Sequence, residues 1–270
     1  MKPITIKDIA HELNISVSTV SRALQDHPDI SEKTKSLVRE CAHRLNYKPN
    51  LMASNLRTSK NTTIGVVIPE LNHHFFSSVL DGIEQTANEA GYQILICQTG
   101  EDVVKERQAV QTLIGSRVAG MLVGVSKQTS HLQHLQDVLD NAIPLVLYDR
   151  PCPSLKCDQV VSDDYMGAFN AVEYLIQTGR QNIMYLSSSM SLEVSRRRYQ
   201  GWRDALQHYS IPMSEDSIIE CDTRSKAIVA APSILQRENA PDAIFCVNDD
   251  SAAGVLHAAK ILGIKIPEEL

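Results

Sequence analysis

The sequence of 270 residues lacks the short motifs that identify most nucleotide-binding enzymes and hydrolases. It contains no G-x-G-x-x-G or G-x-x-x-x-G-K-[ST] phosphate loop and no G-x-S-x-G nucleophile motif. Three consecutive serines, Ser187–Ser189, have no His or acid placed beside them by the sequence to activate them, so we interpret them as a solvated loop. We therefore expect a protein that is not an enzyme.

Metal, disulfide and membrane patterns are missing as well. Of the six cysteines only Cys152 and Cys157 are close, in CPSLKC, and no second Cys/His pair completes a zinc site. No run of 18 uncharged apolar residues occurs, and the start, MKPITIKDIAHEL, does not have the apolar run of a signal peptide. We expect reduced thiols, no metal, no cofactor, no membrane contact and a cytoplasmic location.

The composition is that of a folded globular protein with unevenly distributed charge. Hydrophobic residues make up 43% and charged residues 21%, and the length predicts two or three domains. Residues 1–60 carry ten basic and six acidic side chains, a net +4, which leaves −10 on the rest of the chain. This asymmetry is typical of a small nucleic-acid-binding head on an acidic sensor, although chance clustering gives the same pattern.

The first sixty residues contain three helical patterns. Thr5 followed by Asp8 is a capping signal for the first helix. Asn14-Ile15 ends this helix, and Ser16 and Ser31 can cap two more. Apolar side chains recur on one face of each pattern, and we expect these residues to be buried: Ile6, Ile9, Ala10, Leu13, Val20, Ala23, Leu24, Leu37, Val38, Cys41, Ala42 and Leu45.

Two short helices joined by a tight turn, with a third packed on them, predict a helix-turn-helix. In such a unit the second helix fits the major groove of DNA and its N-terminal side chains reach base edges. Small side chains at Ser18 and Ser21 allow close approach, and Arg22 is long enough to fork onto a guanine. Val17 can contact a thymine methyl or only close the helix–helix core. At this point a three-helix module that binds other proteins remains an alternative.

The segment TIKDIAHELNISVSTVSRAL resembles the headpiece of the LacI/GalR family of bacterial transcriptional regulators, T-I-x-D-V-A-x-x-A-G-V-S-x-x-T-V-S-R-x-L. Asn14 stands where the family usually has Gly, and Asn tolerates the positive φ of that turn. The resemblance implies binding to double-stranded operator DNA, with Val17, Ser18 and Arg22 at the main base-reading positions. It implies further DNA contacts at Thr5, Ser16, Thr19, Ser21 and Tyr47.

A short helix is also expected after Pro49. Asn50 can cap it, but LMASNLR spans about two turns, which are not stable alone in water. RLNYKPNLMASNLR is similar to the family's L-x-Y-x-P-N-x-x-A-x-x-L, whose hinge helix pairs with a second copy in the minor groove and inserts a leucine between base pairs. The resemblance places Asn50, Ala53, Leu56 and Arg57 at the DNA, with Leu56 as that leucine. The alternative is a linker whose apolar residues rest on the core.

Residues 61–270 alternate between strand and helix patterns, which predicts parallel sheets with crossovers. The strands fall into groups before and after about residue 160, so we expect two lobes that bind a ligand beyond the carboxyl ends of their strands. The predicted strands are Ile64–Ile68, Gln93–Cys97, Gly120–Val123, Leu145–Tyr148, Gln159–Val161, Ile183–Leu186, Ser217–Glu220 and Ala243–Val247. Helices are predicted at Ser77–Ala90, Ala168–Thr178, Arg203–Tyr209 and Ser251–Leu262.

This part also resembles the family's core, which is shaped like periplasmic sugar-binding proteins. The resemblance implies a small-molecule effector, a sugar or sugar phosphate, and RYQGW matches the family's effector-contacting R-x-x-G-[FYW]. Aromatic rings, carboxylates, amides and a guanidinium suit sugar hydroxyls or an anion. Each candidate also has an ordinary role, in the core, in an ion pair or as a helix cap. The implied effector-binding residues are Phe75, Phe76, Asp149, Asp163, Arg198, Trp202, Asn248 and Asp249.

The sequence therefore predicts an all-α helix-turn-helix headpiece (1–49), a hinge helix and linker (50–60) and a two-lobed α/β core with parallel sheets, like periplasmic binding proteins (61–270). The N-lobe covers about 61–160 and a partial C-lobe about 161–270; since the family continues beyond IKIPEEL, we expect an incomplete C-lobe. The expected function is that of a homodimeric repressor whose operator affinity a small molecule controls. A sugar-binding α/β protein, or a regulator controlled by a protein partner, is the alternative.

Overall fold

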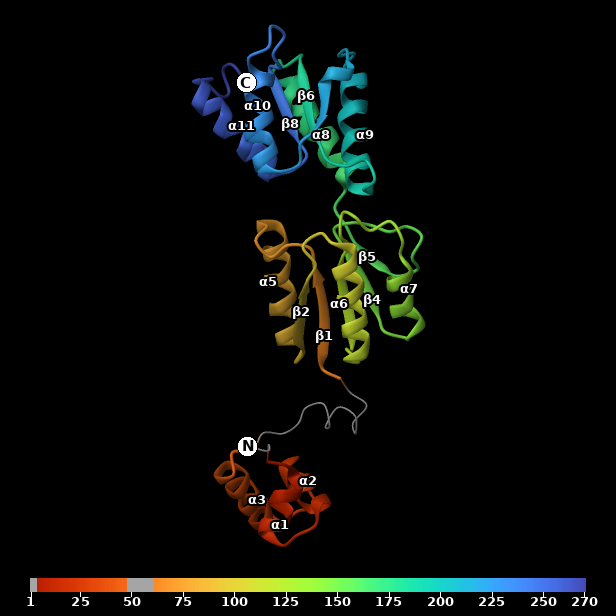
Figure 1. Cartoon of the computed structure of the whole chain (residues 1–270), viewed down its shortest axis with the longest axis vertical. Helices are drawn as coiled ribbons and strands as arrows, with labels where there is room; N and C mark the ends of the chain where they lie inside the picture. The colour runs from red at the N-terminus through yellow and green to blue at the C-terminus, as the bar shows by residue number, and fades with distance from the viewer. Residues whose placement is uncertain (1–3, 48–60) are drawn as a thin grey trace. The chain divides into compact units, whose positions relative to one another are not determined.

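The computed structural model describes residues 4–47 and 61–270. The chain divides into two compact units, Met1–Asn61 and Thr62–Leu270, which we call the headpiece and the core. Figure 1 shows helices in the described part of the headpiece, and strands with helices packed on them in the core. The predicted hinge, with Asn50, Ala53, Leu56 and Arg57, lies outside the described residues.

The described headpiece consists of three helices, α1 (Ile6–Leu13), α2 (Val17–Leu24) and α3 (Glu32–Arg44). Asn14 ends α1 in the left-handed conformation, with φ of 53°, as expected for a residue in the place of Gly. The helices bury a shared apolar core that includes Ile9, Val20 and Val38. The predicted helix-turn-helix is therefore present.

One prediction about α3 is wrong. Leu37 was expected to be buried, but its side chain is 48% exposed. The buried face runs through the predicted Val38, Cys41 and Ala42 and, in addition, through Lys35, at the three- and four-residue spacing of a helix. Lys35 is tolerated on this face because its Nζ reaches Glu32 at 2.8 Å and Asp26 at 3.1 Å.

The N-lobe of the core contains a five-stranded parallel sheet in the order β2-β1-β3-β4-β5. Alternate strand residues face opposite sides of the sheet. Val67 and Leu147 pack against α6 and α7, whereas Ile68 and Tyr148 pack against α5. The elements are β1 (Thr63–Ile68), α5 (His74–Glu89), β2 (Gln93–Gln98), α6 (Val103–Gly115), β3 (Gly120–Gly124), α7 (Gln133–Asp140), β4 (Leu145–Tyr148) and β5 (Asp158–Val160).

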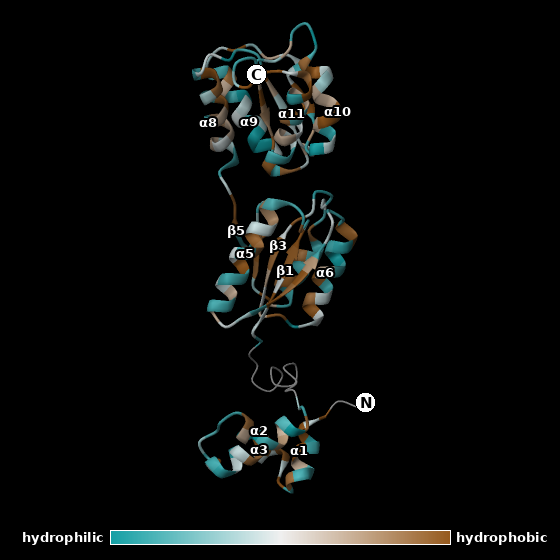
Figure 2. Ribbon diagram, turned by 90° about the vertical axis from the view of Figure 1, so that its left-hand side faces the viewer, coloured by the Kyte–Doolittle hydropathy of each residue, from teal (hydrophilic) through white to brown (hydrophobic). Residues whose placement is uncertain are grey.

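The C-lobe contains a three-stranded parallel sheet in the order β7-β6-β8. One face packs against α8 and α9 and the other against α10 and α11, so helices enclose the hydrophobic strands (Figure 2). The elements are α8 (Asp164–Gln177), β6 (Ile183–Ser187), α9 (Glu193–His208), the 3-10 turn η1 (Glu215–Ser217), β7 (Ile218–Glu220), α10 (Arg224–Leu235), β8 (Ala243–Cys246) and α11 (Asp249–Leu262).

The predicted fold class is confirmed: an all-α headpiece and a two-lobed α/β core with parallel sheets. Every predicted strand is present within one or two residues, but the helices begin earlier than predicted. The largest difference is α9, which starts at Glu193 rather than at Arg203. Its first ten residues, EVSRRRYQGW, are mostly polar and so hide the helical period.

Candidate functional site

The predicted reading surface of the headpiece is the N-terminal part of α2. The Ser16 hydroxyl caps this helix by accepting the backbone N–H of Thr19 at 3.0 Å. It also lies 2.7 Å from the Ser18 hydroxyl and 2.8 Å from the Thr19 hydroxyl. The cap thus fixes the first turn of the helix and the small polar side chains that it presents.

The outer face of α2 carries the side chains predicted to contact bases. Val17 is 41% exposed, Ser18 and Arg22 are exposed, and Ser21 is half-buried. Arg22 forms no ion pair with any residue of the described headpiece. Its guanidinium is therefore available to an external acceptor such as a base edge or a phosphate.

Two further predicted DNA contacts also have structural roles. The Thr5 backbone N–H and hydroxyl both donate to the Asp8 carboxylate at 2.7 Å, which closes the start of α1. Tyr47 packs against the apolar core of the headpiece and is only partly exposed. Both residues therefore stabilise the fold of the headpiece, whether or not they touch DNA.

In the N-lobe, the predicted Asp149 belongs to a charged cluster at the carboxyl ends of the strands. Arg150 forms two hydrogen bonds of 2.8 Å with the Glu101 carboxylate and lies 3.6 Å from Asp149. Burial raises the pKa of Asp149 above its usual range, although Arg150 and Arg198 oppose this effect. Glu101 and Arg150 were not predicted, because the sequence does not show that these distant residues meet.

The two predicted phenylalanines occupy different environments at the start of α5. Phe75 is 43% exposed, whereas Phe76 is buried with Ile68 and Tyr148. The Arg150 guanidinium lies 5.7 Å from the centre of the Phe76 ring. Of the two rings, Phe75 is therefore the one accessible to a ligand. The buried Phe76 ring packs against the Arg150 guanidinium of the charged cluster.

In the C-lobe, the predicted Arg198 is held by an ion pair. Its guanidinium lies 2.7 Å from the Asp164 carboxylate and also donates to the carbonyl of Val247. The close packing of α8 on α9 requires Gly201, because a Cβ there would collide with the carbonyl of Tyr165. The predicted Asp163 caps α8 by accepting the backbone N–H of Met166 at 3.1 Å, and Asp164 beside it is the partner that sequence reasoning missed.

The remaining C-lobe prediction concerns the end of β8. The Asn248 side chain caps α11 by accepting the Ser251 backbone N–H at 2.8 Å, and its amide donates to the Asp222 carbonyl at 3.0 Å. Asp249 is exposed in the first turn of α11. Asn248 thus joins the ends of β7 and β8, and Asp222 is a second residue that the sequence did not reveal.

Two expectations need correction. Trp202 does not lie at the site but in the hydrophobic core, where it is 2% exposed and packs beside Tyr185 and Tyr199. The serine run is not a solvated loop throughout, because Ser187 and Ser188 are buried. Ser187 ends β6 and donates its hydroxyl to a carbonyl of β7 at 3.0 Å, so the sheet edge encloses it.

A buried carboxylate fixes the loop after β3. Glu106 of α6 is fully buried and accepts the Ser126 backbone N–H at 2.5 Å, the His134 Nε2 at 2.7 Å and the Thr129 hydroxyl at 2.9 Å. Burial by itself would raise the pKa of Glu106, but these hydrogen bonds outweigh it and lower the pKa. The loop that follows β3 is consequently anchored to the helix layer.

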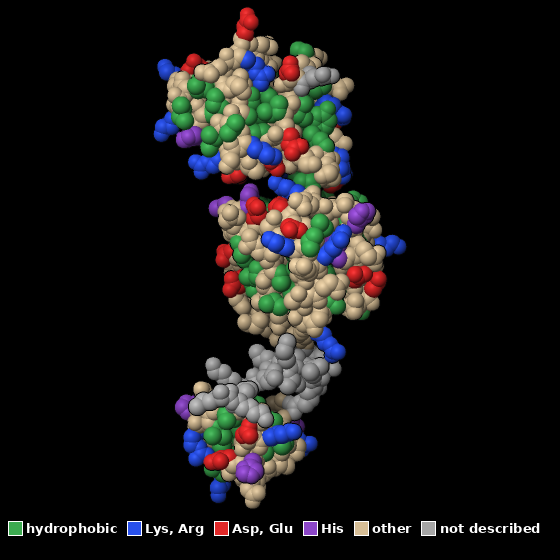
Figure 3. Space-filling model, viewed as in Figure 1, with side chains coloured by type: hydrophobic (Ala, Val, Ile, Leu, Met, Phe, Trp, Pro, Cys, Tyr) green, Lys and Arg blue, Asp and Glu red, His purple; other side chains and the backbone are tan. Residues whose placement is uncertain are grey.

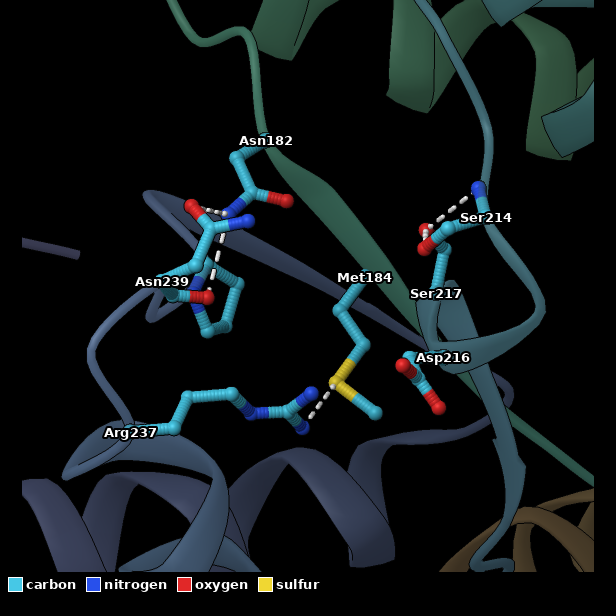
Figure 4. A pocket seen from close by; sticks show the side chains of 8 residues that line it. Asn182, Met184, Ser214, Asp216, Ser217, Arg237 and Asn239 are labelled. Atoms are coloured by element: carbon cyan, nitrogen blue, oxygen red, sulfur yellow. Dashed lines mark hydrogen bonds between the residues drawn. The ribbon is translucent and has the colours of Figure 1, made fainter.

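Two pockets in the described part of the core lie away from these residues. A polar pocket of about 140 Å³ opens at the amino ends of the C-lobe strands (Figure 4). An apolar hollow of about 450 Å³ lies between α5 and strands β1 and β3. Neither is lined by a predicted effector-binding residue. The polar pocket is lined by Asn182, Met184, Ser214, Asp216, Ser217, Arg237, Asn239 and Pro241.

Within residues 4–47 and 61–270, no three His, Cys, Asp or Glu side chains are grouped so that they could hold a metal ion. None of the helices in these ranges has the length and apolar character needed to span a bilayer.

Comparisons with known proteins agree with this architecture. Residues 5–50 match the family model "Bacterial regulatory proteins, lacI family", and residues 61–270 match "Periplasmic binding proteins and sugar binding domain of LacI family". The HTH-type transcriptional repressor PurR of Vibrio atlanticus is 33% identical over 270 residues, which cover 98% of this chain and 80% of that protein. Catabolite control protein A of Priestia megaterium is 30% identical, over 99% of this chain and 80% of that protein.

A solved structure shows the same fold. The lac repressor dimer bound to operator and the anti-inducer ONPF superposes with a TM-score of 0.83, over 99% of this chain and 81% of that one, at 24% identity. The family models together cover nearly the whole chain, and both of these relatives are transcriptional regulators. The chain therefore belongs to the lacI family of bacterial regulatory proteins, with a helix-turn-helix headpiece for DNA and the family's periplasmic-binding-protein-like core for a small-molecule effector.

Proposed function

We propose that the protein is a repressor that binds operator DNA as a homodimer, with α2 of each headpiece in the major groove. The exposed face of α2 carries this proposal, since Ser18 and Arg22 are free of the headpiece core and the first sixty residues are net basic. Two identical headpieces require a pseudo-palindromic operator. A protein that reads operator DNA acts in the cytoplasm of a bacterium, which is the location we propose.

The segment from Asn50 to Arg57 is proposed as the hinge that transmits the effector signal. Leu56 is assigned the wedge between base pairs, with Asn50, Ala53 and Arg57 beside it at the minor groove. A helix of two turns is marginal, so a small difference in effector affinity between two core arrangements is enough to form or melt it. The expected sign of this step is a gain of helix, measured by circular dichroism, when operator DNA binds.

The effector is proposed to be an uncharged sugar rather than a sugar phosphate. Two arginines near the predicted effector-binding residues are already paired, the predicted Arg198 with Asp164 and Arg150 with Glu101. A phosphate would have to take a guanidinium from its carboxylate and would meet the nearby Asp149 and Asp163. Hydroxyl groups, in contrast, can donate to carboxylates and accept from guanidinium groups without breaking the ion pairs.

A two-stage binding experiment tests the proposal. Genomic fragments retained by the purified chain at moderate salt are sequenced, and a panel of sugars and their phosphates is then screened by thermal shift and by operator affinity. A sugar at 100 times its Kd stabilises the core by about 2.7 kcal/mol and changes operator affinity. Stabilisation by phosphorylated sugars alone would contradict the effector class, and retention of all fragments alike would contradict operator recognition.

A further inference from the structure

An ion pair joins the two lobes of the core at the carboxyl ends of their strands. Lys127 follows β3 in the N-lobe, and its Nζ donates to Oδ2 of Asp222, which follows β7 in the C-lobe, at 2.8 Å. The two residues are 95 positions apart in the sequence. Figure 3 shows acidic and basic side chains together along this border of the lobes.

The backbone at both ends of the pair is anchored within its own lobe. The Lys127 N–H donates to the Glu101 carboxylate at 2.7 Å, and Ser126 before it is held by the buried Glu106. On the other side the Asp222 carbonyl accepts the Asn248 amide. Because neither backbone is free to follow the other, the ion pair persists only while the lobes keep their present separation.

The two partners are unequally buried, and this difference favours the state in which they are paired. The Lys127 side chain is 33% exposed, whereas that of Asp222 is 8% exposed. Oδ1 of Asp222 is bound by Lys226 of the same lobe at 2.8 Å. If the lobes part, Oδ2 retains only the Ser188 hydroxyl at 3.4 Å, and an almost buried carboxylate oxygen without a full partner is unfavourable.

Asp222 remains ionised across the physiological range. Burial alone would raise its pKa, but hydrogen bonds from Lys127 and Lys226 outweigh burial and lower the pKa to about 2. Protonation of Asp222 therefore does not release the ion pair at physiological pH, whereas a competing donor or a movement of the lobes can.

We infer that Lys127 and Asp222 form a latch that holds the two lobes together in the absence of effector. Lys127 is then a positioning residue, because it fixes the separation of the two lobes that form the effector site. When effector binds, a ligand hydroxyl donates to Oδ2 of Asp222 in place of the Lys127 ammonium group. This displacement rests on the proposed function, whereas the latch itself does not.

The separation of the lobes can be measured by pulsed electron paramagnetic resonance on the full chain, without DNA or effector. Ketone-bearing residues at the exposed Gln108 of α6 and Lys260 of α11 take a hydroxylamine spin label, which leaves the native cysteines unlabelled. The matched control is Lys226→Met, because Lys226 binds the same carboxylate at the same 2.8 Å from within the C-lobe.

Lys127→Met should lengthen the mean distance between the labels and broaden its distribution. Lys127→Arg, which keeps the charge, and Lys226→Met should both retain the wild-type distribution. An unchanged distribution in Lys127→Met, or an equal shift in Lys226→Met, would overturn the latch. If Lys127→Met does not fold, Lys127→Gln is measured in its place, with the same expected result. Since no DNA or effector is present, the outcome is independent of whether the proposed operator and sugar binding hold.

Discussion

The headpiece and the core hold their polar side chains in opposite ways. In the headpiece, polar contacts are mostly local: Ser16 bonds to Thr19 three residues ahead, and Ser31 bonds to Thr34 in the same manner. Its longer-range ion pairs, such as that of Arg44 with Glu12, lie at the exposed surface. The shape of the reading surface thus depends on helix caps and a small apolar core.

In the core, the contacts that shape the site span long stretches of chain. Glu106 reaches Ser126 across 20 residues and His134 across 28, and Arg150 reaches Glu101 across 49. These contacts are buried or half-buried, and each charge has a partner of opposite sign or a hydrogen-bond donor. The core site exists only when a whole lobe has assembled.

The charged side chains of the two regions suit ligands of different charge. The headpiece leaves Arg22 free of any partner among its described residues, as a polyanion requires, while the core neutralises Arg150 and Arg198 internally. A substitution in one region should therefore leave the unfolding of the other region unaffected. The following predictions test this separation.

The largest effect is expected for Glu106→Gln. Replacing the charge leaves buried donors from Ser126 and His134 without a full acceptor, and breaking such a buried pair costs about 3–5 kcal/mol. Chemical denaturation should show this loss of unfolding free energy in the transition of the core and no change in the transition of the headpiece. Glu89→Gln on the exposed surface of α5 is the control, and an equal loss there would contradict a special role for Glu106.

The same carboxylate predicts an acid-dependent loss of core stability. The pKa of Glu106 is lowered in the folded state, so its contribution is complete above the pKa of the unfolded chain, about 4.3, and disappears as the pH falls through the folded value. Unfolding free energies measured from pH 7 to pH 2 should therefore converge for wild type and Glu106→Gln at the acid end. A constant gap between the two curves would refute this assignment.

Arg22→Ala should weaken operator binding by about 1–3 kcal/mol and relax the preference at one base pair, because a forked contact is lost. Arg22→Lys keeps the charge without the fork and serves as the comparison. Fluorescence anisotropy on the operator and on its single-base variants measures both quantities. If Arg22→Ala weakened binding to every sequence equally, Arg22 would be a phosphate contact instead.

Ser16→Ala should give the smallest effect, a loss of about 1 kcal/mol in headpiece stability from the missing cap of α2. Ser16→Asn, which retains a capping side chain, should restore most of it. Thermal unfolding followed by circular dichroism separates the two variants. A matching shift in the core transition would show that the two regions are coupled.

The sequence was most informative where structure is local. The caps at Thr5, Ser16 and Ser31 and the turn at Asn14 were predictable because each is decided by residues within one helical turn. The inner strands β1, β3, β4 and β6 were predictable because buried parallel strands are continuous apolar runs. Leu37 was misassigned because it lies beside Val38 at the edge of the apolar stripe of α3; the predicted Val38, Cys41 and Ala42 are buried, but Leu37 is exposed.

The charged contacts of the core could not be predicted from the sequence, for a physical reason. No local pattern connects Arg150 with Glu101, Arg198 with Asp164 or Lys127 with Asp222, because only the packed sheets bring these residues together. Trp202 was placed at the site because it stands near Arg198 in a matched motif, yet it lies one helical turn further along α9 and packs in the hydrophobic core, whereas Arg198 reaches Asp164.

The most direct test of operator recognition measures the affinity of the chain for its best genomic fragment and for bulk competitor DNA, at several salt concentrations. Operator recognition by α2 predicts a preference of at least a thousand-fold for the fragment, a strong decrease of affinity with salt, and a reduced preference in Arg22→Ala. Equal affinity for fragment and competitor at moderate salt would contradict it.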